Sequence, residues 1–133
     1  MAYTDGACWP NPGRGGWGVV LIGEVTGERF AEFSGFDPGP TTSNRMELMA
    51  VIEALRAIKG PARIYTDSEL TRNCALRHWK RKANRDLWEL YDLTAAGRRV
   101  EVIWVKGHAG DRWNERADEL ANAAVSCGRS GVA

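Results

Sequence analysis

The tetrapeptide Tyr3-Thr4-Asp5-Gly6 has a close counterpart in Tyr65-Thr66-Asp67-Ser68, and these two segments decide the fold. In each, two residues that favour β-strands lead to an aspartate that a small residue follows, which indicates a strand that ends at the aspartate and enters a turn. We predict that the two strands lie side by side. Both carboxylates would then stand at the carboxyl ends of neighbouring strands, where ligands of open α/β sheets usually bind.

Two more acids fall on the apolar faces of predicted helices. Glu47 belongs to a helical pattern over 44–59, and its spacing places it on the inward face with Val51, Ala54, Leu55 and Ile58. Asp118 shares an apolar stripe with Ala121 and Val125 in the same way. An unpaired carboxylate beside apolar groups is strongly disfavoured, so each of these acids needs a cation.

That cation can be a metal ion or a base of the protein itself. Carboxylate oxygens are the hard ligands that Mg²⁺ prefers. We interpret the set as a divalent-metal site built by Asp5, Glu47, Asp67 and Asp118. For each acid taken alone, the alternative is a buried ion pair with Arg45, Arg116 or another base, because structural ion pairs are as common as functional sites.

The remaining pattern predicts a mixed α/β domain without repeats. Beyond the first strand, β-rich runs are predicted at 17–22, 29–34, 64–66 and 100–105. The first two of these form a hairpin, and the last two should lie parallel to the first strand of the chain. Further helices are predicted at 69–79, 86–96 and 112–125. Asn84 is expected to cap the 86–96 helix, and Gly97 to stop it.

Composition sets the limits of these interpretations. A chain of 133 residues with 44% hydrophobic content and a formal charge of +1 is typical of one globular domain. No apolar run approaches the roughly 20 residues of a membrane span, and no basic leader precedes an apolar stretch, so we expect a cytoplasmic protein. The cysteines Cys8, Cys74 and Cys127 are odd in number and widely spaced, which argues against disulfides or zinc. Cys74 is interpreted as a small apolar residue on a helix.

Six segments, in their order along the chain, resemble ribonuclease H of type 1. They are Thr4-Asp5-Gly6-Ala7-Cys8 with 11–18, 42–50, Thr66-Asp67-Ser68, 104–110 and 114–121. The resemblance implies a ribonuclease H-like α/β fold, a mixed five-stranded sheet flanked by helices on both faces. Residues 1–125 would form the catalytic domain, and 126–133 a frayed tail.

The resemblance also implies an activity and a cofactor. Members of the family are endonucleases that hydrolyse the RNA strand of RNA–DNA hybrids and leave a 5′-phosphate and a 3′-hydroxyl. Two Mg²⁺ ions serve this chemistry, and Mn²⁺ is expected to substitute. By carry-over, Asp5 bridges both ions, Glu47 and Asp67 complete one site, and Asp118 serves the other. His108, in a loop between Gly107 and Gly110, would assist proton transfer. The expected partner is a hybrid duplex, and the expected state is a monomer.

Substrate contacts are implied by the same resemblance. The residues expected to read the minor groove and its 2′-hydroxyls are Cys8, Asn11, Ser43, Asn44 and Asn73. Thr42 and Asn84 correspond to a pocket for a phosphate of the DNA strand. Trp79 and Trp88 correspond to a channel for the DNA sugars, although for Trp88 a place in the core is the alternative.

Some positions depart from the family pattern. Pro40 stands where an arginine often contacts the DNA, and Glu69 stands where a glutamine often contacts the RNA. The basic protrusion of many relatives is reduced to a short link that bears Arg77, Lys80, Arg81, Lys82 and Arg85. Lys80, Arg81 and Lys82 are expected to bind substrate phosphates, and the alternative is a solvated surface run.

Only four residues precede Asp5, so we expect either a natural start upstream of Met1 or a less stable fold. Two other functions stay open from the sequence alone. One is a module that binds hybrids without hydrolysing them, against which the four acids argue. The other is a related nuclease that resolves or integrates DNA, against which Asn11, Ser43 and Asn44 argue.

Overall fold

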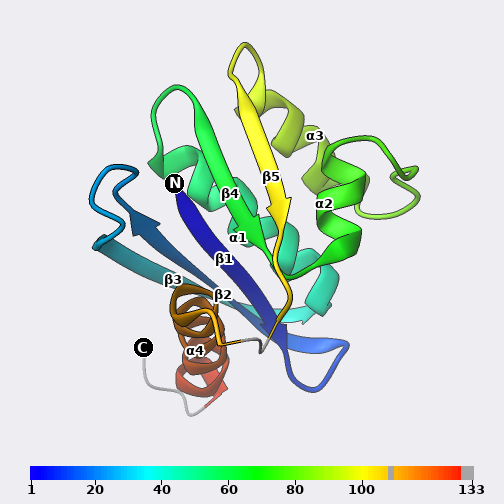
Figure 1. Ribbon diagram of the computed structural model, residues 1–133. Helices are drawn as coiled ribbons and strands as arrows, with labels where there is room; N and C mark the ends of the chain where they lie inside the picture. The colour runs from blue at the N-terminus through cyan, green and yellow to red at the C-terminus, as the bar shows by residue number, and fades with distance from the viewer. Residues whose placement is uncertain (108–109, 130–133) are drawn as a thin grey trace.

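The computed structural model of the chain describes residues 1–107 and 110–129, and this part contains one five-stranded sheet (Figure 1). The strand order is β3-β2-β1-β4-β5. The strands are β1 (Ala2–Cys8), β2 (Gly13–Ile22), β3 (Arg29–Thr41), β4 (Ala62–Thr66) and β5 (Val100–Trp104). β1, β2 and β3 pair antiparallel, whereas β1, β4 and β5 pair parallel. The predicted mixed sheet is therefore confirmed.

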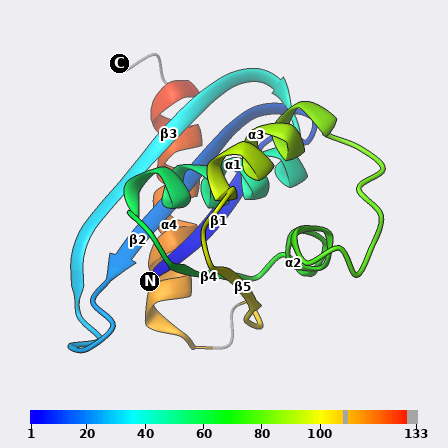
Figure 2. The ribbon, with the colours of Figure 1, turned by 90° about the horizontal axis from the view of Figure 1, so that it is seen from above.

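Helices pack on both faces of the sheet. They are α1 (Ser43–Ala57), α2 (Glu69–Ala75), α3 (Arg85–Ala95) and α4 (Arg112–Arg129). Successive side chains of a strand point to opposite faces. Val19 and Leu21 accordingly pack with α1 and α3 in one apolar cluster, while Val20 and Ile22 pack with α4 in another. Figure 2 shows α3 beside α1, and α2 standing apart, joined to α3 by an extended link.

Several element bounds differ from the predicted ones. α2 ends at Ala75, not near residue 79, because Arg77 adopts a positive φ of 62° and the backbone N–H groups of His78 and Trp79 both turn back to the carbonyl of Asn73. α4 extends to Arg129, beyond the predicted end at residue 125. Residues 130–133 of the predicted tail lie outside the described part of the chain.

Asn84 precedes α3 as predicted but does not cap it in the expected way. It adopts a left-handed conformation, with φ of 60°, and its side chain makes no capping hydrogen bond. Gly97 follows the helix end with φ of 71°, as a stop residue should. Cys74 is buried in α2, as predicted. Within the described residues, no helix is both long and apolar enough to cross a bilayer.

Glycines of β1 and β2 let α1 and α4 approach the sheet closely. A Cβ atom on Gly6 would lie 2.3 Å from the backbone nitrogen of Glu47 in α1. A Cβ atom on Gly18 would lie 2.6 Å from the carbonyl oxygen of Ala117 in α4. No side chain fits in either space, so the two helices carry their own acidic residues to within reach of β1.

Candidate metal centre

Asp5 and Asp67 come together because their strands are neighbours in register. Thr4 of β1 pairs with Thr66 of β4, so each aspartate follows a paired threonine. β4 ends at Thr66, one residue before the predicted end at Asp67, so Asp67 is the first residue of the turn. Asp5 does not end its strand, which corrects the prediction: β1 continues to Cys8 because its last residues pair with β2 after the pairing with β4 has ended.

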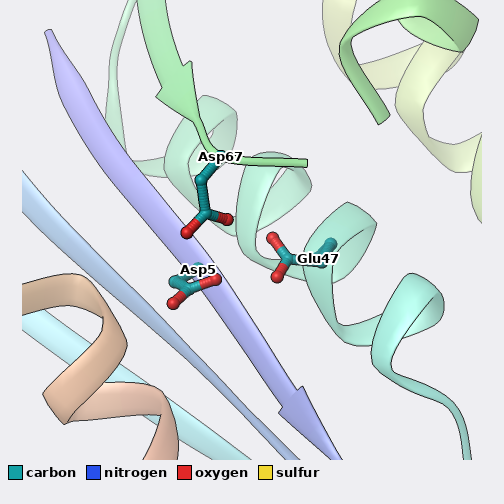
Figure 3. A group of neighbouring side chains, drawn as sticks. All are labelled: Asp5, Glu47 and Asp67. Atoms are coloured by element: carbon teal, nitrogen blue, oxygen red, sulfur yellow. The ribbon is translucent and has the colours of Figure 1, made fainter. Parts of the chain in front are cut away.

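Glu47 reaches the two aspartates from the opposite side. It lies on the first part of α1, and the close approach of α1 at Gly6 brings its carboxylate over β1 (Figure 3). One carboxylate oxygen from each of Asp5, Glu47 and Asp67 lies within 4.8 Å of the other two. Three acids that are 42 and 20 residues apart along the chain therefore form one compact group.

The three carboxylates lie close together and are wholly or partly shielded from solvent, as in a site that binds a cation. Asp5 is only 3% exposed. Burial first, and then repulsion from Glu47, raises the pKa of Asp5; burial also raises the pKa of Glu47. The Oε2 atom of Glu47 is shielded from solvent and has no hydrogen-bond partner among the described residues. Such a set of carboxylates repels itself, and a hard divalent cation would relieve both the repulsion and the unsatisfied oxygen.

The alternative of an ion pair with one of the named bases is wrong. Arg45 pairs with Asp86 at 2.7 Å, and Arg116 pairs with Glu32 at 2.6 Å. Both guanidiniums make two hydrogen bonds with their carboxylates, so both are already satisfied elsewhere. The chemistry of the donor set, which consists of oxygens only, fits Mg²⁺ or a similar ion.

Asp118 lies next to this group but is not part of its tightest contacts. It projects from α4, and hydrogen bonding with it contributes to the raised pKa of Asp5. Asn122, one turn later, donates from Nδ2 to Asp118 Oδ1 at 3.1 Å. The structure thus brings three of the four predicted acids together and places the fourth beside Asp5.

His108 lies outside the described residues, so the prediction for it remains a prediction. The preceding residue does show where this loop begins. A Cβ atom on Gly107 would lie 2.8 Å from Oδ2 of Asp67. The chain therefore passes directly against the metal-site carboxylate as it enters the loop.

Two of the predicted minor-groove residues contact one another at the start of α1. Asn11 Nδ2 donates to Ser43 Oγ at 2.9 Å, and the Ser43 backbone N–H donates back to Asn11 Oδ1 at 3.4 Å. Asn44 follows on the exposed side of the helix, and Cys8 is half-buried at the end of β1. Asn73, in contrast, is buried in α2.

Thr42 and Asn84, the predicted phosphate pocket, are connected through one arginine. Thr42 caps α1 by accepting from the backbone N–H of Arg45, and the Arg45 guanidinium donates to Asn84 Oδ1 at 3.3 Å. Sequence reasoning missed this role of Arg45. The signal is weak in the sequence because its partner Asp86 is 41 residues away.

The two tryptophans have different environments. Trp79 is 46% exposed and available to a ligand. Trp88 is 7% exposed and packs edge to face against Tyr91 in the core, which is the alternative that the sequence left open. Glu69 is exposed at the start of α2, and Pro40 lies in the edge strand β3.

The basic link is divided between free and satisfied cations. Lys80, Lys82 and Arg85 are exposed. Arg81 has a different environment: its side chain is only 10% exposed and is paired with Asp92 at 2.8 Å, which argues against its predicted role as a phosphate ligand. Arg77 pairs with the same carboxylate at 3.3 Å.

Comparisons with known proteins agree with this geometry. A model of the RNase H family matches residues 1–126. A protein named ribonuclease H from Syntrophomonas wolfei is 48% identical over 142 aligned positions, which cover 94% of each chain. A ribonuclease HI from Pseudomonas aeruginosa is 48% identical and covers 95% of this chain and 93% of its own. A solved structure of LC11-RNase H1 in complex with an RNA/DNA hybrid superposes with a TM-score of 0.84 at 26% identity, covering 96% of this chain and 97% of that one.

Proposed function

This chain belongs to the RNase H family, and from that premise we propose that it is an endonuclease that hydrolyses the RNA strand of RNA–DNA hybrids. The products would carry a 5′-phosphate and a 3′-hydroxyl. The observation that carries the proposal is the convergence of Asp5, Glu47 and Asp67, with a shielded Glu47 oxygen that has no hydrogen-bond partner in the part of the chain that the structure describes.

The cofactor that we propose is a pair of Mg²⁺ ions, for which Mn²⁺ can substitute. Asp5, Glu47 and Asp67 would hold one ion, and Asp118 together with Asp5 would hold the second. When bound, two such ions lower the pKa of an attacking water and stabilise charge on the attacking and leaving oxygens of the phosphodiester. The grouped carboxylates support a metal requirement, because without cations they would repel the phosphate.

The protein's own groups would bind and orient the hybrid around these acids. The joined Asn11 and Ser43 side chains supply donors and acceptors for a 2′-hydroxyl, the group by which RNA differs from DNA. Thr42 and Asn84 would contact a phosphate of the DNA strand. His108 would assist proton transfer at the leaving group. Because the net charge is only +1, binding must depend on such local contacts.

Hydrolysis is favoured over mere binding by the intact acid group. A module that only binds hybrids has no need for mutually repelling buried carboxylates, which cost stability. A DNA-directed nuclease would share the acids but would have no use for a 2′-hydroxyl reader.

A comparison of three duplexes tests the proposed substrate. An RNA–DNA hybrid, an RNA duplex and a DNA duplex of one sequence are each incubated with the protein and Mg²⁺, Mn²⁺ or EDTA. We expect cleavage of the hybrid alone, on its RNA strand, and only with metal. Cleavage of the DNA duplex would instead support the DNA-directed alternative.

A further inference from the structure

Arg81 makes contacts that differ from those of the other cations in its segment. Its Nη1 donates to both carboxylate oxygens of Asp92 at 2.8 Å, and its guanidinium lies 4.3 Å from the centre of the Trp88 ring. Its Nε donates to the carbonyl of Cys74 at 2.9 Å. One side chain therefore joins the link to the last turn of α2 and to α3.

The link has few other attachments, one of which is the exposed pair of Arg77 with the same Asp92 at 3.3 Å. It runs over 76–84 without helix or strand, between α2 and α3 (Figure 2). At its start, the N–H groups of His78 and Trp79 donate to the carbonyl of Asn73. The thiol of Cys74 makes a long contact of 3.6 Å with the carbonyl of Lys80. Arg81 supplies the strongest side-chain contacts in the middle of this segment.

Arg81 and its two neighbours have different surroundings. The Arg81 side chain is 10% exposed and contacts α2 and α3, whereas Lys80 and Lys82, on either side of it, are both exposed. They line a surface hollow together with Trp79, whose ring is half exposed. Two ammonium groups beside an aromatic face form a surface suited to a phosphate backbone.

We propose that Arg81 is a positioning residue that presents Lys80 and Lys82 to backbone phosphates of the hybrid without touching the hybrid itself. The inference rests on the proposed function, because it takes the hybrid as the ligand. It assigns to Asp92 a second positioning role, since Asp92 holds the guanidinium on α3.

The variant Asp92→Ala tests the inference, because two explanations predict opposite changes in the affinity for the hybrid. Removing an acid makes the protein more positive, so charge alone predicts tighter binding of a polyanion. Loss of position predicts weaker binding, because the two lysines no longer meet phosphates. Glu89 is the matched control: it is also exposed and lies on α3, so Glu89→Ala changes the charge equally without removing the partner of Arg81.

The experiment measures affinity for a fluorescent hybrid across a salt series, with Ca²⁺ in place of Mg²⁺ so that binding is separated from hydrolysis. The variants are Asp92→Ala, Asp92→Glu, Glu89→Ala, Arg81→Lys, the pair Lys80→Ala with Lys82→Ala, and this pair combined with Asp92→Ala. Thermal unfolding confirms that each variant is folded. Cleavage by the wild type in Mg²⁺ is scored separately, so a protein that binds without cutting refutes the proposed activity but not the positioning role.

We expect Asp92→Ala to weaken binding and to lower the slope of log affinity against log salt by about two, as the lysine pair does. The loss should therefore be about tenfold larger at about 50 mM than at about 200 mM salt. Combining the changes should add little, because both remove the same contacts. Turnover at saturating hybrid should stay unchanged, and Asp92→Glu should restore part of the affinity.

Among the alanine variants, two results would overturn the inference. One is Asp92→Ala binding as tightly as Glu89→Ala. The other is a combined variant whose losses are the sum of its parts, which would show that the lysines act independently of Asp92. If Asp92→Ala does not fold, Arg81→Lys tests the inference instead, because lysine keeps the positive charge but lacks the planar guanidinium that bonds both Asp92 oxygens. Wild-type affinity in that variant, or no hybrid binding by the wild type at all, would equally exclude the positioning role.

Discussion

The backbone of Glu47 lies directly against Gly6: a Cβ atom on Gly6 would stand 2.3 Å from the Glu47 nitrogen. This contact brings α1 onto β1 at the residue that follows Asp5. The Gly6 N–H also donates to Asp5 Oδ1 at 2.9 Å. One glycine therefore orients the Asp5 carboxylate and leaves space for the Glu47 backbone to approach β1. The geometry of the candidate metal centre thus depends on a residue that has no side chain.

Replacing Gly6 by alanine should therefore damage both fold and activity. The added methyl meets backbone, which cannot turn aside, so α1 must move away from β1 and take Glu47 with it. We expect a loss of about 1–3 kcal/mol in unfolding free energy and little hydrolysis. Urea unfolding and a cleavage assay measure these two effects.

Gly23→Ala is the control for this change. There the nearest atom to the added Cβ is a side-chain atom, the Thr26 hydroxyl at 2.7 Å in an exposed turn, so stability and cleavage should change less than in Gly6→Ala. Equal behaviour of the two variants would show that the close contact at Gly6 is unimportant.

Neutralising Asp5 should stabilise the protein in EDTA while abolishing hydrolysis. Burial and the repulsion from Glu47 raise the pKa of Asp5 in the folded state, so the metal-free wild type loses stability as pH rises above the unfolded value of about 4. Asp5→Asn removes this cost. Its advantage in thermal midpoint should be small near pH 4 and grow towards pH 8.

Adding Mg²⁺ should reverse that order, because only the wild type gains strongly from the ion. The check is a set of melting curves at several pH values with EDTA or Mg²⁺. A wild type that melts above Asp5→Asn in EDTA at pH 8 contradicts the account of the carboxylate group.

Glu69 is expected to weaken binding of the hybrid. It is exposed at the first position of α2, where its carboxylate can repel phosphates. Glu69→Gln should lower KM by about two- to fivefold without changing kcat, because the repulsion acts equally on bound substrate and transition state. Steady-state kinetics decide this. An unchanged KM means that the side chain points away, and a large fall in kcat means that it has a role in the chemistry.

The ion pair between Glu32 and Arg116 should make the free energy of unfolding depend on pH in the acid range. Hydrogen bonds from Arg116 and Arg29 lower the pKa of Glu32 to about 2. A lowered pKa in the folded state stabilises the protein above the unfolded value of about 4.3, and this contribution disappears as pH falls from there towards 2.

Because Arg116 is partly solvated, Glu32→Gln should cost at most about 1 kcal/mol at pH 7, and this cost should shrink as pH falls towards 2. Urea unfolding of both proteins at the two pH values tests it. A difference as large at pH 2 as at pH 7 would mean that the substitution acts through packing.

The sequence predicted those parts of the site that depend on the residues of a single strand or helix. The strand that leads to Asp67 and the inward faces carrying Glu47 and Asp118 follow from β propensity and helical spacing. The continuation of β1 past Asp5 could not be predicted in this way, because it depends on the length of the antiparallel partner β2.

Arg81 illustrates the limit most clearly. Five cations within residues 77–85 are typical of an exposed surface, and nothing in their spacing distinguishes Arg81 from its neighbours. Its inward direction depends on Asp92 and Trp88, which the next helix brings to it. Partners supplied by tertiary packing are invisible to a periodicity argument.

The most direct test of the central claim is a single-turnover assay on a hybrid whose RNA strand is end-labelled, with wild type and Asp67→Asn in Mg²⁺. The account predicts that the wild type shortens the RNA to products with 5′-phosphate and 3′-hydroxyl ends, and that Asp67→Asn, although folded, leaves it intact. Cleavage by Asp67→Asn at the wild-type rate would contradict the assignment of the metal centre.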